Sequence, residues 1–115
     1  MSWEWRKACS VLLALIAVSG CDQGSGHTAT LYRNSPLDLG MRVEWGSFRA
    51  NESDAAYNIR NCELAAALLN ANLDALARQA ERTRTQGLGF WCEPGDYRTK
   101  GSVPASFVSR FPTDT

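Results

Sequence analysis

The sequence predicts an α+β fold in which one long helix covers one face of a small antiparallel sheet. Within residues 55–80 the apolar positions recur in steps of three and four and so form one helical stripe: Ile59, Cys62, Ala66, Leu69, Leu73, Leu76 and Ala80. Met41, Val43 and Trp45 alternate with charged residues, which is the period of a strand with one solvated face. Cys92 lies in an aromatic strand, so a disulfide from the helical stripe would join helix and sheet. The expected order is β-β-α-β, with a short fourth strand as an option.

Two strands are expected before the helix. The first covers residues 29–32 and ends in a turn signal at 33–36, and the second covers 41–50. Phe48 breaks the alternation of the second strand just after Gly46. An extra residue at Gly46 or Ser47 would keep Phe48 facing inward, so we expect a bulge there.

The helix is expected to begin at Ser53 or Asp54, either of which is a suitable N-cap, and to end near Arg84, with Gly87 closing it. A helix of about 30 residues would be ~45 Å long, whereas a strand of eight residues covers only ~27 Å. The distal helix therefore either projects beyond the sheet or breaks at residues 70–72, which contain two asparagines.

The third strand is expected at residues 88–93. If Cys92 faces the helix, Leu88 and Phe90 lie beside it, and Trp91 and Glu93 point to the opposite face. Residues 94–96 form a turn, and 97–100 could pair back as the fourth strand. We therefore place the domain at residues 29–100 and expect a loosely ordered C-terminal tail at 101–115.

The N-terminus predicts export. Arg6 and Lys7 precede an apolar run at residues 8–18, and Ser19 and Gly20 supply small residues directly before Cys21. This order resembles the lipobox signal of bacterial lipoproteins, in which signal peptidase II cuts before the cysteine and lipid is attached to its sulfur.

The resemblance implies a signal peptide at residues 1–20, lipidation of Cys21 and a flexible tether at 21–28 that reaches ~20 to 25 Å. The expected partner is then the lipid bilayer, at the periplasmic face of a bacterial membrane. Asp22 resembles the signal for retention in the inner membrane, and the outer membrane remains the alternative.

Charge and cysteine content agree with this interpretation. The formal net charge is zero, so no long-range field draws in nucleic acid. After lipidation of Cys21 the exported chain keeps two thiols, Cys62 and Cys92, in a compartment where disulfides persist. Their pairing would stabilise the domain by ~3 to 4 kcal/mol.

Residues for catalysis or metal binding are scarce. The single histidine, His27, lies in the glycine-rich tether, and the two exported thiols have no second pair of ligands for zinc. We expect no cofactor, no metal and no enzymatic activity. The remaining catalytic hypothesis is a hydrolase that uses Glu44 and Glu93, expected on the outer face of neighbouring strands.

Aromatic residues accompanied by arginine indicate a partner-binding surface, because these residue types anchor protein interfaces. The candidates are Trp91, Tyr97, Arg98, Tyr32 and Arg33. The alternative is that Trp91 covers the open face of the sheet beneath the tail, which carries Phe107 and Phe111.

Several short segments, residues 29–35, 41–43, 57–58 with 61–62, and 90–93, resemble a set of small uncharacterised proteobacterial proteins, which implies no activity. The sequence thus predicts a binding or interaction module whose partner it does not identify; an envelope protein is the candidate. A structural or phage-derived envelope protein is the alternative.

Overall fold

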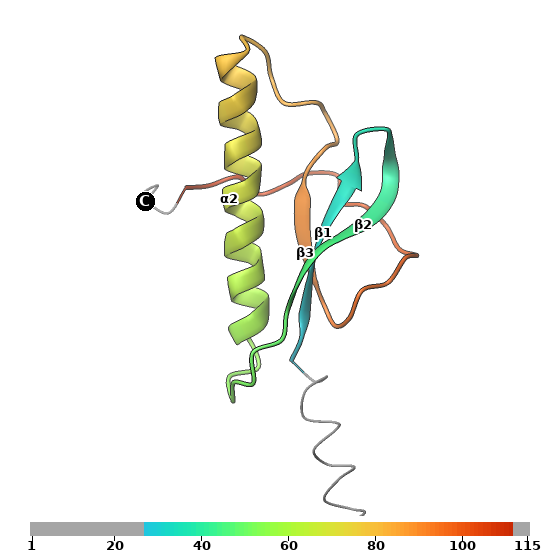
Figure 1. Cartoon of the computed structure of the whole chain (residues 1–115), viewed down its shortest axis with the longest axis vertical. Coiled ribbons are helices and arrows are strands. Elements are labelled where there is room, and N and C mark those ends of the chain that lie inside the picture. Colours follow the sequence, from blue (N-terminus) through green and yellow to red (C-terminus); the bar gives the residue numbers. More distant parts are fainter. Residues whose placement is uncertain (1–26, 112–115) are drawn as a thin grey trace, which may run out of the picture.

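The computed structural model describes residues 27–111, and within them a three-stranded antiparallel sheet packs against one helix (Figure 1). The elements are β1 (Ala29–Ser35), β2 (Asp38–Phe48), α2 (Tyr57–Gln79) and β3 (Phe90–Pro94). The strand order is β2-β1-β3, so β1 is central and β2 and β3 are the edges. The predicted α+β class and the β-β-α-β order are confirmed. The predicted signal peptide and Cys21 lie outside the described residues.

The optional fourth strand does not form. Tyr97 and Arg98 hydrogen-bond to residues of β1 and β2 across the face of the sheet instead of pairing along its edge. The backbone N–H of Arg98 donates to the hydroxyl of Tyr32 at 2.9 Å, and the Tyr97 hydroxyl donates to the carbonyl of Arg42 at 3.1 Å.

The hairpin of β1 and β2 is longer than predicted, because residues 33–35 continue β1 instead of forming a turn. Asn34 explains the difference. It is fully buried, its amide donates to the carbonyls of Leu39 and Gly87, and its Oδ1 accepts from the N–H of Gly89. An asparagine that signals a turn in sequence here ties β1 to β2 on one side and to the loop before β3 on the other.

The bulge lies at Trp45, one residue before the predicted position. Leu31 pairs with Gly46 and Tyr32 pairs with Glu44, so Trp45 is the extra residue in β2. Its ring meets that of Phe90 edge to face, with centroids 5.4 Å apart. Phe48 packs against the core, as predicted.

Helix α2 is continuous through residues 70–72, so of the two alternatives the break is excluded and the projection of the distal helix beyond the sheet holds. Its 23 residues give a length of roughly 34 Å. It begins at Tyr57, after Asp54, whose carboxylate accepts from the N–H of Ala56 in the preceding turn. It ends at Gln79, not near Arg84.

The helix C-terminus is a Schellman motif built without glycine. Glu81 has a positive φ of 56°, its N–H donates to Arg78, and the N–H of Arg82 donates to Ala77. Gly87, expected to close the helix, also has a positive φ, but it lies in the loop before β3.

The core lies between α2 and the sheet. Its buried residues are Ala29, Leu31, Cys62, Ala66 and Phe90, and partly buried Phe48, Ile59, Leu69, Leu73 and Cys92 pack against them. A disulfide joins Cys62 of the helix to Cys92 of β3, which confirms the predicted pairing. Leu76 is 51% exposed because the distal helix extends past the sheet.

The second face of the sheet is also covered. The C-terminal segment, residues 97–111, crosses this face and then reaches α2 (Figure 1, orange to red). We expected a loose tail, yet this segment makes defined hydrogen bonds. The carbonyl of Ser102 accepts from Arg42 at 2.6 Å, the N–H of Arg110 donates to Ala67 at 3.2 Å, and the hydroxyl of Ser109 donates to Asp74 at 2.7 Å.

Candidate functional site

The structure buries two of the aromatic residues that the sequence offered for partner binding. Tyr32 is 0% and Trp91 is 8% exposed, and their rings stack with centroids 5.4 Å apart. The half-buried Tyr97 ring contacts Tyr32, and Phe107 contacts Trp91. Trp91 lies on the face opposite the helix, as predicted, but there it covers the sheet beneath the C-terminal segment.

The two arginines of that predicted surface lie on different faces of the sheet. Arg33 lies on the helix side, 5.2 Å from the ring centroid of Trp45 and 5.5 Å from that of Phe90. The side chain of Arg98 is 69% exposed on the other side, 3.4 Å from Glu93. The five predicted residues therefore do not form one exposed surface.

Glu93 is engaged in a nearly buried ion pair that the sequence did not predict. Arg42, whose side chain is 2% exposed, donates from both terminal nitrogens to the two carboxylate oxygens at 2.7 and 2.8 Å. Trp91 Nε1 donates to the same carboxylate at 2.8 Å. The hydrogen bonds from Arg42, above all, lower the pKa of Glu93 from 4.5 to about 2, although burial opposes this.

This ion pair also explains why the second face can be covered. The guanidinium of Arg42 lies 4.3 Å from the ring centroid of Tyr32, and its Nε donates to the carbonyl of Arg98 at 3.1 Å. The pKa of Arg42 is raised, chiefly by its hydrogen bond to Glu93. An arginine in an alternating strand suggests a solvated face, so its role could not be recognised before the C-terminal segment was placed.

The carboxylate pair expected for a hydrolase is not assembled. Glu44 lies on β2 and Glu93 on β3, and β1 separates these strands, so the expectation that they are neighbours is wrong. Two strand spacings place them about 10 Å apart or more. Within residues 27–111 no group of three or more His, Cys, Asp and Glu side chains could hold a metal ion, and no helix is long and apolar enough to cross a membrane.

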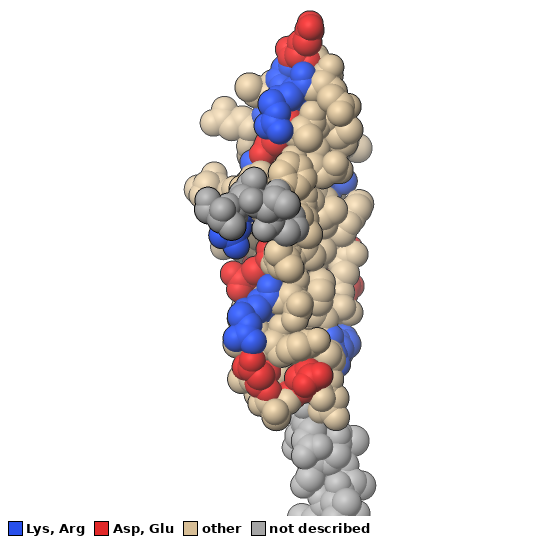
Figure 2. All heavy atoms as spheres, turned by 90° about the vertical axis from the view of Figure 1, so that its left-hand side faces the viewer, with Lys and Arg blue, Asp and Glu red and all other residues tan. Residues whose placement is uncertain are grey.

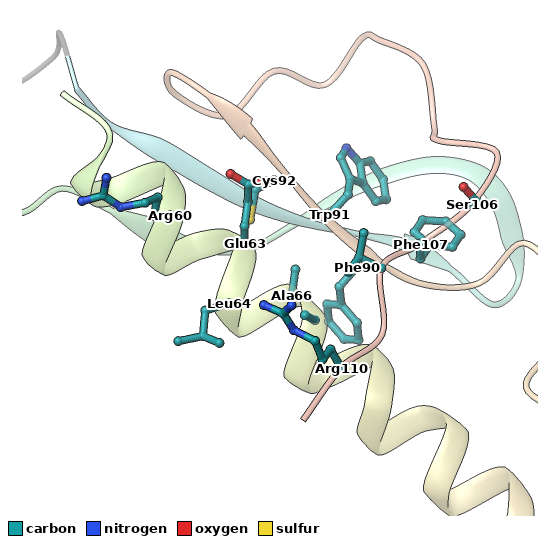
Figure 3. Close-up of a pocket in the computed structure, with 12 residues that line it drawn as sticks. Arg60, Glu63, Leu64, Ala66, Phe90, Trp91, Cys92, Ser106, Phe107 and Arg110 are labelled. Atoms are coloured by element: carbon teal, nitrogen blue, oxygen red, sulfur yellow. The ribbon is translucent and has the colours of Figure 1, made fainter. Parts of the chain in front are cut away.

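A groove with a volume of about 540 Å³ lies between α2 and the free edge of β3 (Figure 3). The helix contributes Arg60, Glu63, Leu64, Ala66 and Ala67, β3 contributes Phe90, Trp91 and Cys92, and the C-terminal segment contributes Ser106, Phe107, Val108 and Arg110. In Figure 3 the C-terminal segment runs past Phe107 and Arg110 and so bounds one end of the groove. We call this cavity the α2–β3 groove.

One half of the free edge of β3 is already occupied by Asn70 of the helix. The N–H of Phe90 donates to Asn70 Oδ1 at 2.8 Å, and Asn70 Nδ2 donates to the carbonyl of Phe90 at 3.0 Å. Nδ2 also donates to the carbonyl of Val108 at 2.8 Å. The side-chain amide thus takes the place of a peptide group from a fourth strand.

The next edge position is Cys92. Gly89 bonds to Asn34 and the N–H of Gly95 donates to Thr28, so the odd residues of β3 turn their backbone groups toward β1. Phe90 and Cys92 therefore turn theirs away from it. Within residues 27–111, the N–H and C=O of Cys92 form no backbone hydrogen bond on the groove side. The next residue that turns its backbone the same way is Pro94, which has no N–H.

The lining of the groove is apolar at its floor and charged at its rim. Leu64 is 46% exposed there, and Arg60, Glu63 and Arg110 are exposed around it. Figure 2, which views the molecule from the helix side, shows acidic and basic side chains interspersed along one margin of an uncharged surface. No large field of one sign surrounds this face in that view.

Comparison with known proteins gives no family and no relative for this chain, because neither family models nor curated proteins nor solved structures match it.

Proposed function

We propose that this protein is an exported, lipid-anchored binding module that captures an envelope partner in the α2–β3 groove. The observation that carries the proposal is the groove itself: a cavity of about 540 Å³ with an apolar floor and an unpaired strand position, beside a disulfide that fixes its two walls. We assign partner binding to the groove and not to a surface of exposed aromatic rings, because the rings of Tyr32 and Trp91 are buried.

The fixed walls support binding in particular. Cys62 and Cys92 both belong to the elements that form the groove, and their Cα atoms are 6.0 Å apart. The disulfide therefore limits how far helix and strand can separate. A preformed site loses little conformational entropy when it binds, which favours affinity.

Lipid anchoring at Cys21 supports an envelope location for the partner. The tether of residues 21–28 would hold the domain within ~25 Å of the bilayer. Confinement near a membrane raises the effective concentration of a partner in that membrane, so a groove of modest affinity suffices.

The test is photo-crosslinking from the groove in intact cells. A photoreactive phenylalanine replaces Leu64, and the matched control replaces Leu76, which has similar exposure on the same helix but lies outside the groove. We expect a discrete crosslinked partner from position 64 and none from position 76. The partner is then identified by mass spectrometry, and its binding is measured with purified proteins.

Equal crosslinking from both positions, or a purified partner that binds wild type and Leu64→Asp alike, would contradict the proposal.

A further inference from the structure

We propose that the ligand of the α2–β3 groove is a short extended peptide that hydrogen-bonds to the backbone of Cys92 and places one apolar side chain in the groove that Leu64 and Phe107 help to line. This inference rests on the proposed function and names the class of its partner. It assigns a binding role to main-chain atoms that no sequence motif marks.

The first argument is the backbone geometry of β3. Cys92 presents an N–H and a C=O toward the groove, and this pair matches what an added strand needs. The neighbouring pair, on Phe90, is satisfied by the amide of Asn70. The protein therefore already uses amide pairing along this edge, and the groove offers the one adjoining position to an external peptide group.

The second argument is the length of the open edge. Asn70 blocks it on one side of Cys92, and Pro94 ends it on the other. A single exposed residue is too short for edge-to-edge pairing of two folded sheets. It suits a peptide segment that contributes one or two backbone hydrogen bonds and obtains the rest of its affinity from a side chain.

The third argument is the composition of the groove next to that edge. The groove, which Leu64 and Phe107 help to line, has room for an aliphatic or aromatic side chain, and Val108 is 74% exposed at the margin. The rim carries two positive groups, the guanidinium groups of Arg60 and Arg110, and one negative group, the carboxylate of Glu63. Arg60 is already paired with Asp54, so Arg110 is the positive charge that would favour an acidic residue in the peptide.

The experiment uses the oxidised domain and capped pentapeptides of the form Ser-Asp-Leu-Thr-Ser, with Ala or Phe replacing Leu and Lys replacing Asp. We expect saturable binding for Leu and Phe, about tenfold weaker binding for Ala, and weaker binding for Lys than for Asp. Leu64→Asp should weaken binding of the Leu peptide about tenfold or more, and the matched Leu76→Asp should leave it unchanged.

Two measurements isolate the backbone contact. At a peptide concentration about ten times Kd, hydrogen exchange of the Cys92 amide should slow about tenfold, while the amide of Gly40, in the distant hairpin, should not change. N-methylation of the peptide amides one at a time should abolish binding at a single position only, because the carbonyl of Cys92 can accept one peptide N–H and the other peptide amides face no open backbone group of β3.

Peptide binding that leaves the Cys92 amide unprotected, or that survives Leu64→Asp, would overturn the inference. So would self-association of the domain that Leu64→Asp abolishes, since the occupant would then be a second copy. If none of the peptides binds but a purified envelope partner still binds in a Leu64-dependent way, the extended-peptide inference fails and the proposed function stands. If Leu64→Asp also leaves binding of the purified partner unchanged, the extended-peptide inference and the proposed function are both refuted.

Discussion

Replacing Asn70 with alanine should destabilise the whole domain far more than its place in the middle of a helix suggests. Asn70 is 0% exposed and takes part in three hydrogen bonds, two with Phe90 and one with Val108. The alanine variant leaves one N–H and two C=O groups without these partners. At about 1 kcal/mol for each net hydrogen bond, the loss is ~3 kcal/mol.

Asn72 provides the matched control, since it is an exposed asparagine two residues further along the same helix. Asn72→Ala should change stability by no more than ~0.5 kcal/mol, because surface substitutions of this kind are nearly neutral. The expected difference between the two variants corresponds to a fall in Tm of roughly 15 °C for a domain of this size.

The assay is thermal and urea unfolding of the oxidised protein, followed by circular dichroism. Asn70→Asp adds a second test at the same site. It keeps the oxygen that accepts from Phe90 but loses both donated bonds, and it buries a carboxyl group whose pKa should rise. This variant should therefore be less stable at neutral pH than at acidic pH, relative to wild type. The reasoning is refuted if Asn70→Ala unfolds within ~1 kcal/mol of Asn72→Ala.

Four further predictions concern anchoring, the disulfide and the second face of the sheet. Mass spectrometry of the mature N-terminus should find an acylated Cys21, and Cys21→Ser should release the protein from the membrane fraction; unchanged membrane association would contradict lipidation. Alkylation without reductant should label neither Cys62 nor Cys92 in the exported protein, and labelling of either would show a free thiol. Because the folded pKa of Glu93 is about 2, below its ordinary 4.5, its stabilising contribution is complete above pH 4.5 and is lost as pH falls toward 2. Acid titration should thus destabilise wild type more than Glu93→Gln over that range, and equal slopes would contradict the ion pair. Trp91→Ala should lower the free energy of unfolding by ~3 kcal/mol or more, because a buried ring is removed from between Tyr32 and the C-terminal segment. A nearly unchanged Tm would contradict the burial of this ring.

Strand faces and element order were predictable because they depend on local periodicity. The two-residue period of β3 placed Trp91 and Glu93 opposite Cys92, and the structure confirms it through the stacking of Trp91 on Tyr32. The bounds were less accurate. Residues 33–35 resemble a turn when only their neighbours are considered, yet Asn34 is held in β1 by bonds to Leu39, Gly87 and Gly89, and Gly87 and Gly89 lie more than 50 residues away along the chain.

The candidate site was harder to predict than the fold because it depends on which elements cover which. The surplus of aromatic residues suggested a binding surface, but Arg42 and Glu93 form an ion pair over Tyr32 that lets the C-terminal segment bury the rings. The groove is assembled from three segments that are distant in sequence, and its key polar atoms belong to the backbone of Cys92. Backbone atoms are the same at every residue, so no composition or spacing marks them.

By itself, the sequence determined the α+β class, the helix that carries the apolar stripe, and the disulfide between Cys62 and Cys92. The class and the helix follow from local periodicity. The disulfide was predicted from the resemblance to a lipoprotein signal, which leaves Cys62 and Cys92 as the two exported thiols, so neither inference needs knowledge of distant contacts. Only the tertiary structure decided that α2 continues through Asn70, that the second face of the sheet is closed, and that the edge of β3 is open at Cys92. In each case the deciding interaction joins residues that are far apart in the chain, so its free energy exists only once the chain has folded.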